Sequence, residues 1–218
     1  MYRVIKRGFD IFSSILLLIA ISPLFIVLMG LVRINLGSPI FFKQLRTGKD
    51  MRKFNLIKFR TMTDEKDETG NLLSDHERVT GFGRFLRSSS LDELPELINI
   101  IKGDMSVIGP RPLPPTYDKY YKDEELSRFN VRGGLITPDS VDSNPIISWD
   151  KQFEYEAEYG KDPSLKNDFF IFWGVFRILF KRNKTDYGSF ERKSLCQERQ
   201  EKGGFVLQSE CNFMEEEI

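Results

Sequence analysis

Two adjacent carboxylates, Asp92 and Glu93, lie in the segment that is richest in groups able to do chemistry. Five cations are predicted on separate elements that can converge on these acids: Lys58, Arg60, Arg84, Arg87 and Arg111. Arginine forks match phosphate oxygens bidentately, and one carboxylate can attack phosphorus while its neighbour handles a metal ion or a proton. The pattern favours phosphoryl chemistry on a diphosphate that carries Mg²⁺. In the alternative interpretation, the acids only cap a helix and the cations only form surface salt bridges.

An amphipathic apolar spacing predicts that a helix presents the two acids and ends at Gly103. Because Pro95 suits the first turn of a helix, we expect this helix to begin near Asp92, with Asp92 as its N-cap. Ser90 with Glu93 also matches a capping box. Either arrangement would place both carboxylates at the start of the helix.

The predicted cations lie on other elements. Residues 83–87 are predicted to be helical, which places Arg84 and Arg87 on one face. Arg111 lies between two prolines, which restrict its backbone and lower the entropy cost of presenting its guanidinium to an anion. These cations are therefore candidate phosphate ligands.

Two short strands are predicted at Pro39–Phe42 and Phe54–Met62, on either side of a basic turn. Alternate side chains of a strand share a face, so Lys58 and Arg60 should project together. The sequence therefore predicts an α+β fold that is predominantly helical, with a small antiparallel sheet.

An almost uninterrupted apolar run extends from Phe9 to Val32, with basic residues before and after it. At about 1.5 Å per residue, a straight helix of this length would cross a hydrocarbon core of about 30 Å. Basic flanks favour the cytoplasmic side at both ends, and Pro23 frees the carbonyl of Ile19, to which Ser22 can donate. We expect a re-entrant membrane helix that breaks at Ser22 and Pro23; a simple transmembrane span and a cleaved signal peptide are the alternatives.

Composition excludes several other classes of protein. The 32 basic and 32 acidic residues cancel, so no global positive field indicates nucleic acid, and 40% hydrophobic content argues against a disordered chain. The single histidine, His76, excludes an HExxH zinc site. Cys196 and Cys211 form no CxxC pair, which argues against a disulfide framework and a cysteine zinc site.

A second membrane signal lies in residues 165–184. Basic residues lie among aromatic residues that recur there at helical spacing. The aromatic residues are Phe169, Phe172, Trp173, Phe176 and Phe180. A core helix and an amphipathic helix in the membrane interface both explain this pattern. We predict three regions: a membrane hairpin (1–36), a cytoplasmic catalytic domain with interfacial helices (37–184) and a polar tail (185–218).

Five motifs occur in order along the chain: Ser22-Pro23, Lys58-Phe-Arg60-Thr-Met62, Ser90-Leu-Asp92-Glu93-Leu-Pro95-Glu-Leu, Lys102-Gly-Asp104-Met-Ser106 and Gly109-Pro-Arg111-Pro112. Together they resemble the bacterial sugar transferases, also called monotopic phosphoglycosyl transferases. The resemblance covers roughly Met1 to Lys184.

The resemblance implies an enzyme on the cytoplasmic face of the bacterial inner membrane. It would move a phospho-sugar from a UDP-sugar to undecaprenyl (polyprenyl) phosphate, release UMP and start glycan assembly for a capsule, O-antigen, exopolysaccharide or glycoprotein. Asp92 would be the nucleophile, with an aspartyl phospho-sugar as intermediate and Glu93 as its partner. Mg²⁺ would bind at Asp92 and Glu93. The implied phosphate and substrate ligands are Lys58, Arg60, Arg84, Arg87, Arg111 and Arg132.

One segment departs from the family. Where members usually carry Arg-Pro-Gly-Ile-Thr-Gly-Trp-Ala-Gln, residues 132–140 are Arg-Gly-Gly-Leu-Ile-Thr-Pro-Asp-Ser, and the divergence extends to Asn144. The segment could shape the donor pocket, so the identity of the sugar does not follow. A catalytically weak paralogue, a non-catalytic membrane-anchored interaction protein and a hydrolase of lipid diphosphates stay open as alternatives, as does homo-oligomerisation.

Overall fold

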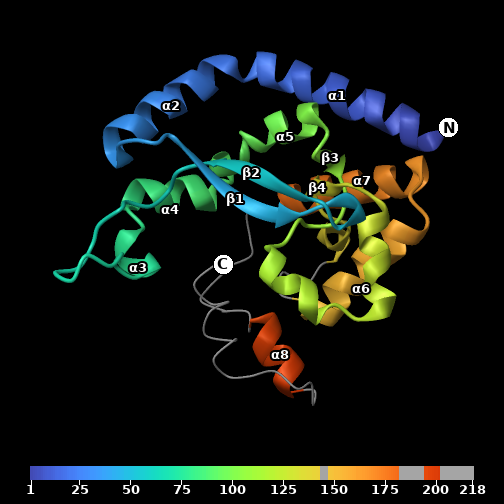
Figure 1. The fold of residues 1–218 in the computed structure, drawn as a ribbon. Helices are drawn as coiled ribbons and strands as arrows, with labels where there is room; N and C mark the ends of the chain where they lie inside the picture. Colours follow the sequence, from blue (N-terminus) through green and yellow to red (C-terminus); the bar gives the residue numbers. More distant parts are fainter. Residues whose placement is uncertain (143–146, 182–193, 202–218) are drawn as a thin grey trace. The chain divides into compact units, whose positions relative to one another are not determined.

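The computed structural model describes residues 1–142, 147–181 and 194–201. It is mostly helical with small sheets, as predicted (Figure 1). Internal contacts divide the chain into two units. Phe9–Gln44 and Asn55–Gly103 form the unit that holds the two acids; Met1–Gly8, Leu45–Phe54 and the described residues from Asp104 onward form the other. The predicted division at residues 36 and 184 concerns membrane contact and stays a prediction.

The α-helices are α1 (Tyr2–Ala20), α2 (Ser22–Leu36), α3 (Asp75–Arg78), α4 (Gly81–Ser88), α5 (Glu96–Lys102), α6 (Trp149–Lys161), α7 (Leu165–Lys181) and α8 (Leu195–Glu201). The 3₁₀ segments are η1 (Lys49–Met51), η2 (Leu91–Glu93), η3 (Pro115–Tyr120), η4 (Asp123–Asn130) and η5 (Pro138–Val141). The strands are β1 (Phe41–Thr47), β2 (Lys53–Phe59), β3 (Met105–Ile108) and β4 (Gly133–Ile136).

The apolar run folds as two helices that meet at a sharp bend. The axes of α1 and α2 differ by 68°, with the break at Ile21 (Figure 1). The hydroxyl of Ser22 donates to the carbonyl oxygen of Ile19 at 2.8 Å, which confirms the predicted bond at the proline break. Within the described residues, no single helix has both the length and the apolar character to cross a membrane, and α1 and α2 reach that threshold only as a bent pair.

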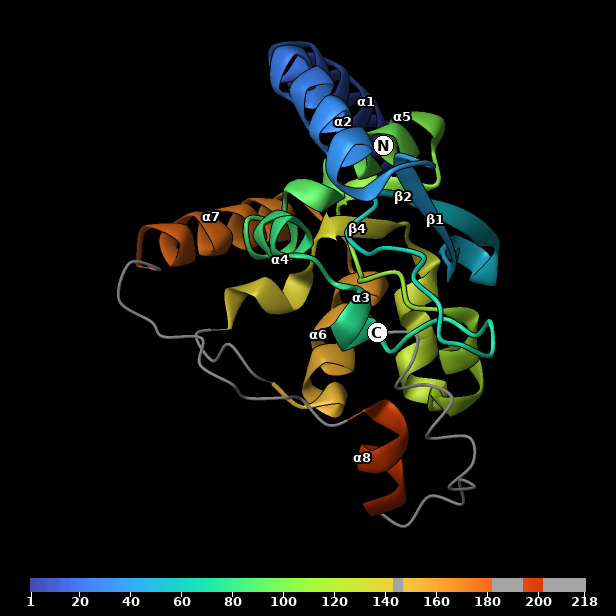
Figure 2. The ribbon, with the colours of Figure 1, turned by 90° about the vertical axis from the view of Figure 1, so that its left-hand side faces the viewer.

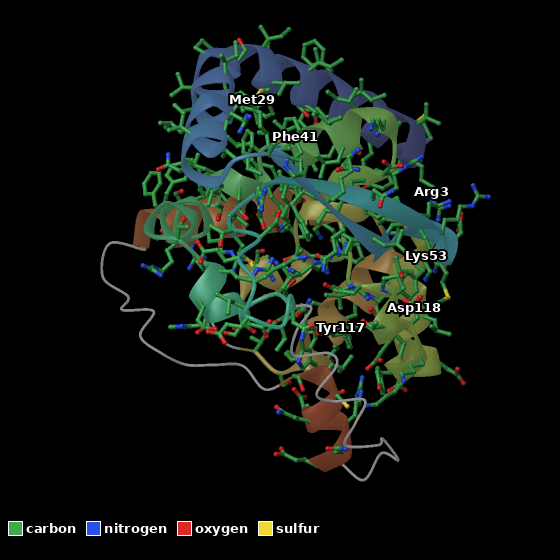
Figure 3. All side chains as sticks on the ribbon, turned by 60° about the vertical axis from the view of Figure 1, so that its left-hand side comes forward. Arg3, Met29, Phe41, Lys53, Tyr117 and Asp118 are labelled. Atoms are coloured by element: carbon green, nitrogen blue, oxygen red, sulfur yellow. The ribbon has the colours of Figure 1, made fainter. Side chains whose placement is uncertain are left out.

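One face of α2 belongs to a hydrophobic core. Leu28, Val32 and Leu36 pack with Phe59 of β2 and Leu86 of α4. Met29 and Phe41, labelled in Figure 3, lie at the edge of this cluster. Other apolar side chains of α1 and α2 stay exposed, and they include Phe12, Ile19, Ile26 and Ile34. The bent pair therefore carries a large apolar surface that no described residue covers.

The strand bounds differ from those predicted. Only residues 48–52 connect β1 to β2, which is too short for the crossover that a parallel pair needs. The turn relies on Asp50 and Met51, both at positive φ, so local pattern did not mark the ends of the strands. The end of β1 and the start of β2 share polar contacts with Asp118. The hydroxyl of Thr47 donates to the Asp118 carboxylate, and Lys53 donates to Thr47 and forms an ion pair with Asp118, which lies near Lys53 in Figure 3.

The second sheet corrects the expectation of purely antiparallel pairing. Strand β3 pairs with β4 in parallel, with Met105 opposite Gly133 and Ile108 opposite Ile136. Parallel pairing requires a long crossover, and the chain between these strands contains η3 and η4. Helix α7, drawn in orange-brown in Figure 2, packs on β3 and on η5.

The described part of the tail is folded. Leu195 and Cys196 of α8 are fully buried in a cluster with Trp149 and Phe153 of α6. The guanidinium of Arg199 forms an ion pair with Glu125 at 2.7 Å. Cys196 is disulfide-bonded, which the cysteine spacing did not predict.

Candidate active site

The two adjacent acids do not begin the helix in the predicted way. Asp92 and Glu93 lie in the 3₁₀ segment η2, and α5 begins only at Glu96, with Pro95 as its N-cap residue. Ser90 adopts a left-handed conformation with φ 55° and makes no capping bond through its side chain. The N-cap and capping-box predictions are therefore wrong, because the chain tightens into 3₁₀ geometry before the proline.

Helix α5 is fixed to β2 by one buried side chain. Oδ1 of Asn99 accepts from the backbone N–H of Ile57 at 3.0 Å, and Nδ2 donates to the carbonyl of Asn55 at 2.8 Å. Gly103 ends the helix at φ 101°, as predicted. These two hydrogen bonds, to the residues before and after position 56, set the register between α5 and the strand that carries Lys58.

That register brings Lys58 to the acids. Its Nζ lies 2.9 Å from Oε1 of Glu93 and 3.3 Å from Oε1 of Glu96. All three side chains are partly or largely buried, so the attraction is screened less than at an open surface. Glu96 was not among the predicted site residues, although its place three residues after Glu93 puts it one helical turn away.

Asp92 is buried, with 8% of its surface exposed. Burial raises the pKa of its carboxyl group, the positive charge of Lys58 opposes that shift, and the negative charge of Glu93 reinforces it. Arg87 also lowers this pKa by its charge. Asp92 is therefore a desolvated carboxylate with two cations nearby. Such surroundings are typical of a functional site and favour the binding of an anion beside the carboxylate.

Arg87, Arg84 and Arg60 lie in the same unit as Asp92 but have different partners. Nε of Arg87 donates to Oγ1 of Thr61 at 3.0 Å. Nη1 of Arg84 donates to the carbonyl of Val79, one turn back. Arg60 is buried and donates to the carbonyls of Ser38 and Met62, and it also pairs with Asp64 at 2.5 Å. The charge of Arg87 acts on Asp92 and lowers its pKa.

Arg111 and Arg132 belong to the other unit. Arg111 is exposed and follows Pro110 directly after β3, while Arg132 is half-buried directly before β4. Gly134 N donates to the carbonyl of Pro110 at 2.9 Å, so the two arginines flank one backbone contact. The sequence predicts both arginines as phosphate or substrate ligands, and these roles stay predictions.

No group of three or more His, Cys, Asp and Glu side chains within the described ranges is arranged to hold a metal ion. Mg²⁺ is often bound by one or two protein carboxylates together with substrate phosphates and water. Asp92 and Glu93 supply that number of carboxylates, so the donor set fits such a shared ion.

A family model described as bacterial sugar transferase matches residues 1–182. The chain belongs to the bacterial sugar transferase family. The motifs identified this family correctly, and the protein is an enzyme of the sugar transferase class.

Curated relatives within this family include two of similar length. The "Uncharacterized sugar transferase EpsL" of Bacillus subtilis is 44% identical over 72% of this chain and 77% of its own length. The "Exopolysaccharide production protein ExoY" of Sinorhizobium fredii is 35% identical over 80% of this chain and 83% of its own. The "UDP-glucose:undecaprenyl-phosphate glucose-1-phosphate transferase" of Klebsiella pneumoniae is 34% identical over 84% of this chain, which spans only 42% of that relative.

Proposed function

We propose that this sugar transferase moves a phospho-sugar from a UDP-sugar to undecaprenyl phosphate or a similar polyprenyl phosphate. The observation that carries the proposal is the burial of Asp92 beside Lys58 in a chain of this family. Relatives in the same family are named as transferases of glucose 1-phosphate, of galactose phosphate and of N-acetylgalactosamine phosphate to undecaprenyl phosphate. The reaction class is therefore transfer of a phosphorus-containing group.

The first step is attack by an Oδ atom of Asp92 on the β-phosphorus of the donor. The bond from that phosphorus to the oxygen bridging to the α-phosphate breaks, and UMP leaves with this oxygen and the electron pair. The phospho-sugar is then held on Asp92 as an acyl phosphate. In the second step, a phosphate oxygen of the lipid attacks the same phosphorus and displaces the carboxylate, which yields a lipid diphosphate sugar.

The residues around Asp92 offset negative charge that would otherwise oppose this attack. Lys58 holds Glu93 and Glu96 and adds a positive charge beside the nucleophile. Arg87 and Arg111 are assigned to phosphate oxygens, and Glu93 assists the second step by handling a proton. Mg²⁺ held by Asp92 and Glu93 would neutralise diphosphate charge when it is bound.

Membrane attachment on the cytoplasmic face of the bacterial inner membrane completes the proposal. The exposed apolar side chains of α1 and α2 supply a surface suited to lipid, and the bend at Ser22 and Pro23 suits a helix that re-enters one leaflet. Phe169, Phe172 and Trp173 of α7 are about half exposed or more, which suits the headgroup region. A lipid phosphate lies at this depth, so an enzyme seated there meets its acceptor directly.

The test is release of UMP by the purified full chain in detergent or nanodiscs, with polyprenyl phosphate and a set of donors. UDP-glucose, UDP-galactose and UDP-N-acetylgalactosamine are the first choices, given the names of the relatives. Asp92→Asn should abolish UMP release, and Asp75→Asn, which alters an exposed acid of α3 in the same unit, should not. Intact-mass analysis with donor alone should show a phospho-sugar adduct on the wild type and none on Asp92→Asn.

The alternatives give different products. A hydrolase of lipid diphosphates would release inorganic phosphate without needing a UDP-sugar, and a non-catalytic interaction protein would release neither product. A weak paralogue would form the adduct on Asp92 but turn over slowly with every donor in the set. UMP release that persists in Asp92→Asn would overturn the assignment of the nucleophile.

A further inference from the structure

Both backbone polar groups of Arg111 are held by a single ion pair. The N–H of Arg111 donates to Oε1 of Glu156 at 2.9 Å, and Nη2 of Arg128 donates to the carbonyl oxygen of Arg111 at 2.6 Å. The same Nη2 lies 2.6 Å from Oε2 of Glu156, so the pair closes on itself. Helix α6, through Glu156, and segment η4, through Arg128, thus both hydrogen-bond to the backbone of Arg111 in the loop after β3.

This ion pair is buried and oriented by further groups. The side chain of Arg128 is 1% exposed and that of Glu156 is 0% exposed. Nη1 of Arg128 donates to the hydroxyl of Tyr121, and Nε2 of Gln152 donates to Oε1 of Glu156 at 3.0 Å. Buried charges persist only where they are paired and hydrogen-bonded, and these bonds restrict the geometry of the pair.

Residues 110–112 contain few backbone groups that can donate a hydrogen bond. Pro110 and Pro112 lack an N–H, so the amide of Arg111 is the only backbone donor within residues 110–112. On the opposite side, the N–H of Gly134 donates to the carbonyl of Pro110. The backbone is therefore anchored on both sides, whereas Arg111 as a residue is exposed.

We propose that Arg128 and Glu156 are positioning residues that hold the guanidinium of Arg111 for the phosphate oxygens of the donor. This inference rests on the proposed function, in which Arg111 binds those oxygens. A guanidinium fork recognises phosphate bidentately only when it is held in orientation, and that orientation begins at the backbone. Arg128 and Glu156 act through Arg111 and do not touch the substrate.

The test is a double-mutant cycle between Arg111→Ala and Glu156→Gln, measured as KM and kcat for the UDP-sugar. Each single variant should raise KM by about tenfold or more with a smaller change in kcat, since donor binding is what is lost. The double variant should be no worse than Arg111→Ala alone, because Glu156 has nothing left to position. Glu154→Gln is the matched control: Glu154 lies on the same helix, is exposed and pairs with Lys151, and its variant should leave KM unchanged.

A purely structural role gives a different outcome. If Glu156 only stabilises the fold, its effect multiplies with that of Arg111→Ala, and the inference is overturned while the proposed function stands. If Arg111→Ala leaves KM unchanged although the wild type releases UMP, the phosphate role of Arg111 is wrong, and the inference falls with that assignment alone.

A second measurement does not depend on activity. Amide hydrogen exchange in a peptide covering residues 109–113 should accelerate in Glu156→Gln and not in Glu154→Gln, because the only amide between the two prolines loses its ionised acceptor. If Glu156→Gln does not fold, Tyr121→Phe removes one partner of Arg128 and should give the same two changes, about threefold in KM. Unchanged exchange in every folded variant would overturn the inference even where no transferase activity is found.

Discussion

Nζ of Lys58 lies 2.9 Å from Oε1 of Glu93, so a side chain of β2 reaches across to the acid that directly follows Asp92. The same ammonium group lies 3.3 Å from Glu96. One cation therefore balances two carboxylates while its charge also lowers the pKa of a third, Asp92, which burial raises. Removing this cation would leave three acids close together without their nearest counter-charge.

Lys58→Gln should lower kcat/KM for UMP release by about 100-fold, because one preorganised cation beside a reacting anion is worth about that much. The acid limb of the pH profile should also move to higher pH, because the pKa of Asp92 loses the charge that lowers it. Lys53→Gln is the control: Lys53 lies on the same strand and pairs with Asp118 instead. Equal losses in both variants would contradict the assigned role of Lys58.

Asp92 should cost the protein stability at neutral pH. Its pKa is raised above the ordinary value of 3.8 mainly by burial, so the native state binds a proton more readily than the unfolded state. Stability then falls as pH rises through the native pKa, and the wild type gains relative stability on acidification. Asp92→Asn should raise the melting temperature at pH 7 by a few degrees, with the difference shrinking toward pH 4.

Thermal unfolding of both proteins across this pH range checks the sign. Asp75→Asn, at an exposed acid, should show no such gain. A lower melting temperature for Asp92→Asn at pH 7 would mean that the attraction of Lys58 and Arg87 outweighs burial.

The parts of the fold that local chemistry decides were predictable from sequence. Pro23 had to leave the carbonyl of Ile19 without its usual donor, and a serine beside it was a ready substitute. Gly103 was predictable as the end of α5, because glycine adopts the left-handed backbone conformation of a helix C-terminus without steric strain. The types and order of the residues around the two acids also indicated phosphoryl chemistry, which is the reaction class of the enzyme, whereas the role of each residue stays a prediction.

What escaped prediction depends on contacts distant in sequence. The register between α5 and β2 is set by the two hydrogen bonds of Asn99, which no local pattern reveals. Pairing of β3 with β4 joins residues about thirty apart, as does the pairing of Arg128 with Glu156. Arg60, predicted as a phosphate ligand beside Lys58, lies beyond the end of β2, where its guanidinium donates to the carbonyl of Ser38. Its role in phosphate binding stays a prediction, and residue type alone did not reveal this backbone contact.

The combined variant Ser22→Ala with Pro23→Ala should straighten the bent pair. An alanine at position 23 restores an N–H for the carbonyl of Ile19, and removal of the Ser22 hydroxyl removes its present partner. A continuous helix over residues 2–36 would be long enough to span the bilayer. Tags at the N-terminus and at Gly70 should lie on the same side in the wild type and on opposite sides in the variant.

The control for that topology is Ser13→Ala. Ser13 makes a similar bond to the carbonyl of Phe9, but within a regular helix without proline, so its loss should change nothing. Tags on opposite sides in the wild type would refute the re-entrant helix.

Trp173 should contact lipid. It is 51% exposed on α7 and stacks with Phe169 and Phe176, whereas Trp149, the only other tryptophan, is buried. Brominated lipids in nanodiscs should therefore quench part of the fluorescence of the wild type and almost none of that of Trp173→Phe. Leu126→Glu, at an exposed apolar residue of η4, should keep the wild-type quenching. Quenching that survives in Trp173→Phe would place the membrane contact elsewhere.

Gly134 should tolerate no side chain, although it lies in the segment that departs from the family. A Cβ at this position would lie 2.1 Å from the backbone nitrogen of Gly109 and 2.6 Å from its carbonyl oxygen. Gly109 directly follows β3 and its N–H donates to the carbonyl of Ile136, so its backbone cannot easily move. Gly134→Ala should lower the free energy of unfolding by about 2–3 kcal/mol, measured by denaturant titration. At the neighbouring Gly133 the nearest atoms would be 3.2 Å away, so Gly133→Ala should cost well under half as much. Because the N–H of Gly134 also donates to the carbonyl of Pro110, Gly134→Ala should raise KM for the donor as well. Equal stability of the two alanine variants would show that β3 and β4 do not approach this closely.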